Sequence, residues 1–424
     1  MLNILHKIEK RNGVVVPFNE KNIEKALINV LREANAVNDP AYDKLPGKVS
    51  RTVFEELFNN KEEDFIANVN DVHKLVENTL MDMKFFDIAR SYIEHRKEHS
   101  RDIFKKRVNI KPYEYPELIS FIDAIRHSYW VHTEFNYNPD IQDLKVDLEP
   151  HEVQIVERTM LAISQIESAV KEFWGKIGNK LPKPEIKKIG ATFSESEVRH
   201  EDAYSNLIEI MGLNKKFEEL KNIPAINDRI KYLERVNQNN NAIDNKDFFE
   251  SIILFSMFIE NVSLFSQFLI IMSYYKHGRK LKGMSNAVEA TSKEENIHAM
   301  FGFDLVKIIK TENPDWWTDE LVDYIYNITR DAYKAEVNIV NWIYEGGDSK
   351  FAKKDQTIEY IKKRLNDSLI AIDLKPIFDI NLEVLAKTMW FDEEIEVGKD
   401  TDFFNKRSTA YTKKTKSITE DDLF

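Results

Sequence analysis

The run Ile252–Met272 is apolar along nearly its whole length and carries one carboxylate, Glu260, near its middle. At about 20 residues, such a run is long enough to cross a bilayer as a helix. A carboxylate at the centre of a membrane span costs roughly 3 kcal/mol, which argues against that interpretation. The run is therefore predicted to be a helix buried on nearly all sides of a soluble protein, and its carboxylate needs a partner.

The composition agrees with a soluble, mainly helical chain. Of its 424 residues, 42% are hydrophobic and 31% charged, and Gly and Pro, which interrupt helices, number only 12 each. A net charge of −12 argues against nucleic-acid binding, and the lack of any cysteine excludes disulfides, thiolate-held metals and thiol chemistry within the chain. The first residues have no long apolar core like that of a signal peptide, so we expect a cytoplasmic protein without membrane contact.

Three regions follow one another along the chain. Residues 1–100 predict a small α+β domain, with a hairpin that turns at Asn12-Gly13 and helical periods over 20–34 and 71–98. Residues 101–395 predict a helical domain that begins with a linker at 101–118. Its helices are expected at 151–174, 194–212, 247–275, 284–310, 319–345 and 356–372. The charged, aperiodic residues 396–424 predict a flexible tail.

Two pairs of carboxylate and imidazole are the candidates for chemistry in the helical domain. Glu197-x-x-His200 and Glu295-x-x-His298 each place the two groups on one helix face, and only these two of the ten histidines have Glu at that offset. In a Glu-rich chain such pairs also arise by chance, mostly as surface neighbours. The spacing alone therefore does not establish a metal site.

Two further glutamates strengthen the case for metal. Glu167 shares its helix face with Met160 and Ile163, and Glu260 lies inside its apolar run, so both are expected to face the core. A core-facing Glu followed by a Glu-x-x-His occurs twice in this chain. This arrangement is the pattern of di-iron and di-manganese carboxylate bundles. Two divalent cations would neutralise four buried carboxylates. The alternative, pairing with buried Lys or Arg, finds no matching basic residue on these apolar faces.

At these residues the chain resembles the radical-generating small subunit of class I ribonucleotide reductase, through most of residues 125–424. The resemblance rests on segments such as FSESEVRHEDAYSNL, SKEENIHAMFGFDLV and FFNKRSTAYTKK. It implies a ferritin-like helical bundle with a dinuclear metal site, whose ligands are Glu167, Glu197, His200, Glu260, Glu295 and His298. The first of these is often Asp in the family. The resemblance favours manganese at both positions, with iron or a mixed Mn/Fe pair as alternatives.

The resemblance also implies a radical path. Tyr204 occupies the position of a stable tyrosyl radical in many members, whereas in others the metals keep the oxidising equivalent and Tyr204 would be an ordinary buried tyrosine. Trp130 matches the tryptophan of the family's electron-transfer chain, unless it is plain core, and Glu294 falls where that chain often has Asp. Tyr411 resembles the tyrosine that relays the radical onward, and the terminal ITEDDLF resembles the peptide that docks the large catalytic subunit.

Residues 1–100 resemble an ATP-cone, a nucleotide-sensing module. The resemblance implies ATP and dATP, with Mg, as allosteric effectors. The candidate contacts are Lys10, Arg11, Asn12, Asn19, Lys21, Ile23, His73, Arg96 and Lys97. Asn22 precedes Ile23 where the family commonly has Lys, so the phosphate contacts stay open.

These expectations describe a ribonucleoside-diphosphate reductase subunit that is active only with its large subunit. The reaction served is the reduction of ribonucleotides to deoxyribonucleotides, which in this family needs cysteines that this chain lacks. A homodimer is implied by the resemblance, and a dATP-induced tetramer is a hypothesis that rests on the placement of the cone. Two alternatives use the same bundle: a standalone dimetal oxidase or oxygenase of a small or lipidic substrate, and a ferritin-like metal store.

Overall fold

The computed structural model describes residues 6–9, 15–59, 62, 65–99, 101–170, 172–238 and 244–395. The chain divides into two compact units, Met1–Asp102 and Ile103–Phe424. Each unit has its own hydrophobic core, as separate domains do.

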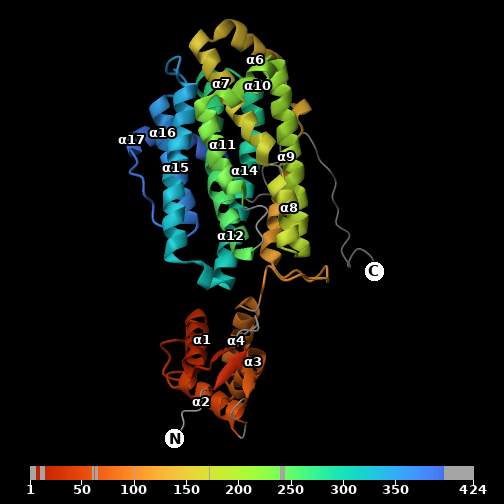
Figure 1. The fold of residues 1–424 in the computed structure, drawn as a ribbon, viewed down its shortest axis with the longest axis vertical. Helices are drawn as coiled ribbons and strands as arrows, with labels where there is room; N and C mark the ends of the chain where they lie inside the picture. Colours follow the sequence, from red (N-terminus) through yellow and green to blue (C-terminus); the bar gives the residue numbers. More distant parts are fainter. Residues whose placement is uncertain are drawn as a thin grey trace. The chain divides into compact units, whose positions relative to one another are not determined.

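The N-terminal unit packs four helices with a three-stranded sheet of order β2-β1-β3 (Figure 1). Strand β1 runs antiparallel to β2 and parallel to β3, so that Ile8 lies opposite both Val16 and Ala67. The elements are β1 (Lys7–Glu9), β2 (Val15–Pro17), α1 (Glu20–Glu33), α2 (Leu45–Phe58), β3 (Ile66–Asn68), α3 (Val69–Asp82) and α4 (Phe86–His99). The two strands of the predicted hairpin are confirmed, and its turn lies outside the described residues.

Local signals fix the ends of these helices. Asn19 is the N-cap of α1, and its side chain accepts a hydrogen bond of 3.1 Å from the backbone N–H of Lys21. The helix expected over 20–34 is confirmed. The continuous helical period expected over 71–98 was wrong, because the chain breaks between α3 and α4, where Lys84 adopts a φ of 63°. A residue with left-handed backbone conformation commonly ends a helix. The apolar period in the sequence nevertheless continues from α3 into α4, because both helices pack on one core.

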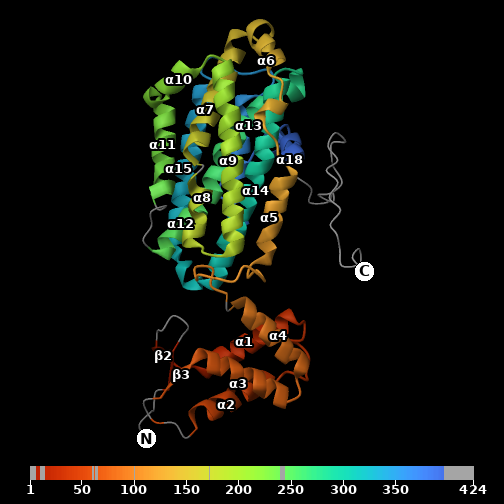
Figure 2. The same ribbon diagram turned by 90° about the vertical axis from the view of Figure 1, so that its right-hand side faces the viewer.

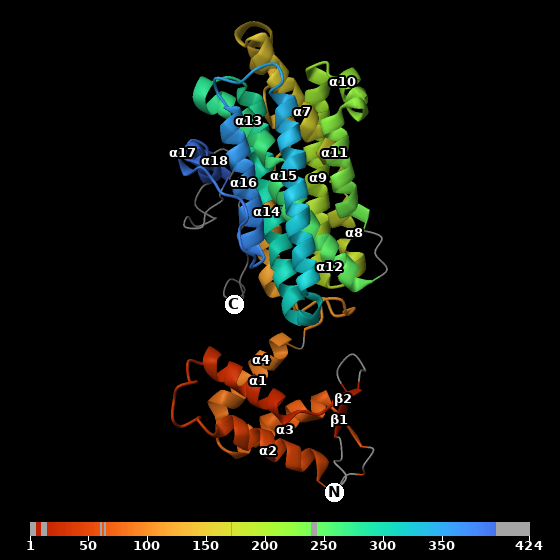
Figure 3. The same ribbon diagram turned by 60° about the vertical axis from the view of Figure 1, so that its left-hand side comes forward.

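The C-terminal unit is a bundle of long helices: α7 (Pro150–Val170), α9 (Pro184–Ile210), α14 (Lys282–Glu312), α15 (Asp319–Ile343) and α16 (Lys354–Ala371). Figure 2 shows α9 and α14 with α5 beside them, and Figure 3 shows α15 and α16 on another side of the bundle. The shorter elements are η1 (Pro116–Ile119), α5 (Ser120–His127), η2 (His132–Glu134), α6 (Asn138–Gln142), η3 (Asp143–Asp147), α8 (Glu172–Lys180), α10 (Asn214–Glu218), η4 (Glu219–Asn222), α11 (Pro224–Gln238), η7 (Pro314–Trp316), α17 (Leu382–Leu385) and α18 (Met389–Ile395).

The apolar run forms α12 (Asn245–Leu254), the π-helical segment η6 (Phe255–Ser263) and α13 (Phe265–Gly278), one after another. Among the described residues it is the one helical stretch long and apolar enough to span a bilayer, and its most apolar window is wholly buried in the bundle. The prediction of a buried core helix is confirmed. Glu260 lies in η6, and π-helical turns are frequent at functional sites.

The segment 101–118, expected as a linker, is anchored on the bundle by Ile103 near its start and by Tyr115 and Leu118 at its end, whereas most of residues 105–112 are exposed. Ile103, Tyr115 and Leu118 are fully buried in its core. The Tyr115 hydroxyl donates to Glu312 at 2.7 Å, and Glu185 accepts from the backbone N–H of Tyr115 at 2.9 Å. The sequence hides this packing because the buried residues follow no helical or strand period and because their polar partners come from distant helices.

Candidate metal centre

All six residues expected as metal ligands meet in the middle of the bundle. Glu167 comes from α7, the first Glu-x-x-His from α9, Glu260 from η6 and the second Glu-x-x-His from α14. None of the six side chains is more than 2% exposed. The helical period therefore brings to one place what the sequence separates by more than a hundred residues.

The six side chains form two groups that share two members. The first group consists of Glu167, Glu197, His200 and Glu295, and the second of Glu197, Glu260, Glu295 and His298. Within each group, one potential ligand atom from every residue lies within 4.8 Å of the others. Glu197 and Glu295 belong to both groups, as carboxylates that bridge two neighbouring cations would.

Each imidazole turns its Nδ1 atom toward the carboxylates. The Nδ1 atom of His200 lies 2.9 Å from Glu295 and 3.7 Å from Glu167. The Nδ1 atom of His298 lies 3.0 Å from Glu197 and 3.5 Å from Glu260. The two rings, with centroids 6.2 Å apart, thus offer one nitrogen each to adjacent positions.

Burial of these carboxylates in one place is electrostatically costly without cations. Burial raises the pKa of Glu167 and of Glu260 well above the usual range. Burial acts to lower the pKa of His200 and of His298, but the carboxylates around each ring outweigh it and raise both pKa values well above normal. The pKa of Glu295 is held far below its usual value, since contacts with the two imidazoles outweigh its burial.

Apart from the close approaches between imidazole and carboxylate, the polar atoms of the cluster have no partners. Beyond those approaches, both oxygens of Glu167 and of Glu197, and the Nδ1 atoms of the two histidines, have no hydrogen-bond partner in the described part of the chain. Buried polar groups are normally satisfied, so orphaned atoms converging on one spot call for an unseen partner. Carboxylate oxygens and imidazole nitrogens suit iron and manganese, and two divalent ions balance four carboxylates. The residues present therefore fit a dinuclear metal site.

The outer nitrogen of each ring has a fixed partner that sets its tautomer. His200 places Nε2 2.8 Å from a carboxylate oxygen of Glu294. His298 places Nε2 3.0 Å from the hydroxyl of Ser196, whose own proton is donated to the carbonyl of Phe193 at 2.8 Å. Both partners therefore accept a hydrogen bond from Nε2–H, and in the neutral ring this leaves Nδ1 unprotonated for a metal.

Glu294 also holds the segment that carries Trp130. Its oxygens accept two hydrogen bonds from the Arg199 guanidinium, at 3.1 and 3.2 Å, and one from the Ser128 hydroxyl at 3.3 Å. Trp130 is 4% exposed, and its ring stacks on His200 at 5.8 Å with an interplanar angle of 14°. The indole Nε1 has no hydrogen-bond partner in the described ranges, so Glu294 is connected to Trp130 only indirectly, through Arg199, Ser128 and His200.

Tyr204 lies one helical turn after His200 and is 1% exposed. Its burial raises the pKa of the phenol well above the usual range, and the nearby side chain of Thr291 counteracts this only in part. A cavity of about 270 Å³ reaches from the exposed Ser205 and Asn214 to Tyr204 and Glu167. Small solutes therefore have a path to this side of the cluster.

The sequence patterns assigned no role in the site to Ser196, Arg199 or Trp174. Trp174 was expected at the end of the helix that carries Glu167, over 151–174, but it lies in the separate helix α8, and its indole N–H donates to Glu260 at 2.8 Å. This bond fixes one oxygen of Glu260 and leaves the other for the cluster. The one signal in the sequence was an indole donor on an otherwise apolar face.

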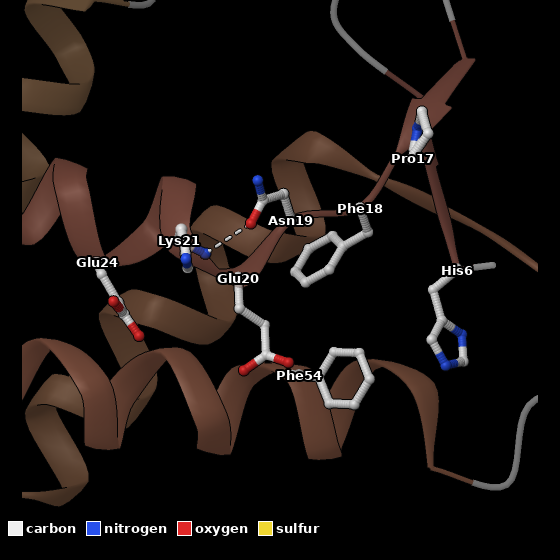
Figure 4. Close-up of a pocket in the computed structure, with 8 residues that line it drawn as sticks. All are labelled: His6, Pro17, Phe18, Asn19, Glu20, Lys21, Glu24 and Phe54. Carbon is white, nitrogen blue, oxygen red and sulfur yellow. Dashed lines mark hydrogen bonds between the residues drawn. The ribbon is translucent and has the colours of Figure 1, made fainter. Parts of the chain in front are cut away.

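The candidate nucleotide-contact residues of the N-terminal unit do not form one cluster in the structure but lie in different places. Asn19 and Lys21 line a cavity of about 500 Å³ together with His6, Phe18, Glu20 and Phe54 (Figure 4). Ile23 is buried in the core instead. His73 bonds Tyr92 at 2.9 Å, and Arg96 pairs with Glu77 at 2.9 Å, both on the α3–α4 pair.

The remaining expected site residues cannot be placed. Lys10, Arg11 and Asn12, the side chain of Lys97, and the tail at 396–424 with Tyr411 lie outside what the structure describes.

Comparisons with known families match the two units separately. Residues 107–384 match the family model described as ribonucleotide reductase, small chain, and residues 6–101 match that of the ATP cone domain.

Among curated proteins, the chain is similar to the ribonucleoside-diphosphate reductase subunit beta of Chlamydia pneumoniae, 24% identical over 66% of this chain and 83% of that protein. A probable small subunit from Invertebrate iridescent virus 3 is 22% identical over 72% of this chain and 85% of that protein. The anaerobic ribonucleoside-triphosphate reductase of Escherichia coli is 32% identical over 24% of this chain, which is 13% of that protein.

Solved structures share the fold of the bundle. The R2 subunit from Clostridium botulinum superposes with a TM-score of 0.60 at 19% identity, covering 66% of this chain and 88% of that one. The dimanganese(II)-NrdF of Streptococcus sanguinis gives 0.58 at 15% identity, covering 66% and 97%. The predicted fold, a ferritin-like helical bundle preceded by a small α+β domain, is confirmed.

Proposed function

Because the chain belongs to the ribonucleotide reductase small-chain family and carries an ATP cone, we propose that it generates the radical with which a separate large subunit reduces ribonucleotides to deoxyribonucleotides. The observation that carries the proposal is the pair of buried groups that share Glu197 and Glu295. The absence of cysteine from its 424 residues agrees, since reduction in this family takes place at cysteines, here those of the partner.

The two groups divide the work of holding two metal ions. Glu167 and His200 would hold one ion and Glu260 and His298 the other, while Glu197 and Glu295, which belong to both groups, would contribute to both. Such a pair of ions supplies, once oxidised, a strong one-electron oxidant. We favour manganese at both positions, with iron or a mixed pair as the alternatives that metal analysis separates.

The chain's own residues hold and guide this oxidising equivalent. Glu294 and Ser196 keep the two imidazoles in the metal-binding tautomer. Trp130, stacked on His200, takes up the oxidising equivalent, and Tyr411 passes it to a cysteine of the large subunit, which the C-terminal tail docks. The buried Tyr204 is the candidate for a stored radical.

The N-terminal unit acts as the regulator. The cavity bounded by Asn19 and Lys21 is the proposed site of ATP or dATP, where the carboxylate of Glu20 is suited to a bound Mg ion. We expect dATP to convert a homodimer into a tetramer that blocks docking of the large subunit. Light scattering with ATP and with dATP tests this, and an unchanged molar mass in both would reject it.

The test of the main proposal is turnover by the reconstituted pair of subunits. We expect two metals per chain and deoxyribonucleotide product only when a large subunit from the same organism is present. Oxidation of a small molecule by this chain alone would favour a standalone oxidase, to which the cavity at Glu167 gives access. Many metals per chain would favour a store.

A further inference from the structure

An exposed tyrosine stands directly before the buried Trp130. Tyr129 is 56% exposed, although large aromatic side chains are usually covered, whereas Trp130 is 4% exposed. Two consecutive residues thus connect the solvent with the metal cluster: Tyr129 is exposed, and Trp130 stacks on His200, a proposed metal ligand. None of the roles assigned above involves Tyr129.

The position of Tyr129 is fixed by hydrogen bonds on both of its sides. The Ser128 hydroxyl donates to Glu294 at 3.3 Å, and the carbonyl of Trp130 accepts from Arg199 at 3.1 Å. The Arg199 guanidinium carbon lies 4.6 Å from the centroid of the Tyr129 ring. This cation–π contact holds an exposed ring in one place, where a free side chain would sample several rotamers.

Arg199 lies close to both rings. Its guanidinium carbon is 5.7 Å from the centroid of the Trp130 ring. Since the same carbon is 4.6 Å from the centroid of the Tyr129 ring, the two ring centroids are at most about 10 Å apart. An electron can cross such a gap without an intermediate carrier.

The surroundings of Trp130 destabilise its oxidised form. Its Nε1 has no hydrogen-bond partner in the described part of the chain, so no neighbouring base can take the indole proton and the oxidised ring stays a cation. The positive charge of Arg199 repels that cation. Glu294 offsets this repulsion only in part, because it already shares its charge with Arg199 and His200.

Neither effect applies to Tyr129, because its exposed phenol can lose its proton to water and its oxidised form then carries no positive charge. One electron passes from its ring to oxidised Trp130, which returns to the neutral indole. The phenol proton leaves to water, so the resulting tyrosyl radical is neutral and is not repelled by Arg199. An electron and a proton from the next carrier then restore the phenol.

We propose that Tyr129 is a further radical relay, which carries the oxidising equivalent from the buried Trp130 to the surface of the bundle, from where it passes on toward the large subunit. The inference rests on the proposed function, and it adds to that function a residue and an exit point.

The decisive variant is Tyr129→Phe, which keeps the ring over Arg199 and removes only the group that can lose a proton. We expect unchanged metal content, an unchanged EPR spectrum of the oxidised subunit and unchanged affinity for the large subunit, but at least a tenfold loss of turnover. The matched control is Tyr324→Phe, at a 39% exposed tyrosine of α15, which should keep full turnover. Turnover of Tyr129→Phe within twofold of the unaltered chain would overturn the proposal.

A second measurement detects the radical itself. With 3-aminotyrosine, which is oxidised more easily, at position 129, mixing with the large subunit, substrate and effector should yield an aminotyrosyl EPR signal, and the same replacement at 324 should yield none. No signal at 129 would overturn the proposal, as would a loss of turnover in Tyr129→Ala that Tyr129→Phe restores, since that pattern marks packing alone. Failure of the proposed function looks different: the unaltered chain would then make no deoxyribonucleotide with its large subunit.

Discussion

The two candidate ligand histidines have different hydrogen-bond partners, so the two proposed metal positions can be weakened one at a time. In Glu294→Gln the side chain keeps its shape but offers one acceptor oxygen and one NH₂ group. Arg199 donates to both oxygens of Glu294, so the amide oxygen turns to Arg199 and the NH₂ group faces His200. Nε2 must then accept, the ring proton moves to Nδ1, and the nitrogen meant for the metal is blocked.

The size of the effect follows from these contacts. Loss of a partner that orients a ligand histidine typically lowers metal affinity about 10- to 100-fold, which is about 1.4 to 2.7 kcal/mol. We expect Glu294→Gln near the upper end, because a charge-assisted bond of 2.8 Å is lost and the tautomer is reversed. Ser196→Ala removes a neutral bond of 3.0 Å at the other ring and should cost about three- to tenfold.

Competition with a chelator of known affinity measures the two steps of metal binding separately. Glu294→Gln should weaken the position that includes Glu167 and His200, and Ser196→Ala the position that includes Glu260 and His298. Unfolding midpoints of the metal-free variants control for loss of structure. The reasoning fails if Glu294→Gln weakens both positions equally or leaves both unchanged.

Further outcomes follow from the same cluster. Glu295→Ala should leave less than one metal per chain by elemental analysis, since this carboxylate belongs to both groups; two retained metals would contradict the assignment. The raised pKa values of Glu167 and Glu260 keep protons on the metal-free protein, so metal binding should release protons and weaken as the pH falls. Calorimetry in two buffers of different ionisation enthalpy tests this, and equal heats would refute it. The raised carboxyl and histidine pKa values also make the folded metal-free chain bind more protons than the unfolded one, so its stability should fall as the pH rises above the ordinary carboxyl pKa. Metal at 100 times its dissociation constant should restore about 2.7 kcal/mol, seen as a higher melting temperature of the bundle. Tyr411→Phe should keep the oxidised centre and lose turnover, and unimpaired turnover would remove Tyr411 from the relay.

Local sequence was enough to find the members of the site. The three-residue spacing of each Glu-x-x-His and the apolar faces around Glu167 and Glu260 are periodic features, and a helix converts periodicity into a common face. The same regularity predicted the long helices and the burial of the apolar run. It failed where a single backbone angle decides whether a helix continues or ends, as at Lys84 between α3 and α4.

Only the tertiary structure decided how these residues are used. Three features depend on contacts between segments far apart in the chain: Glu197 and Glu295 belong to both groups, Trp174 fixes Glu260, and Ile103, Tyr115 and Leu118 pack on the bundle. The exposure of Tyr129 and its contact with Arg199 also depend on tertiary packing. The physical reason is that periodicity reports which face of a helix is buried, whereas partners, tautomers and bridging carboxylates are set by which buried faces meet. This sequence by itself predicted the fold class and the six candidate ligands, and the packing of the helices decided which of them lie in one group and which belong to both.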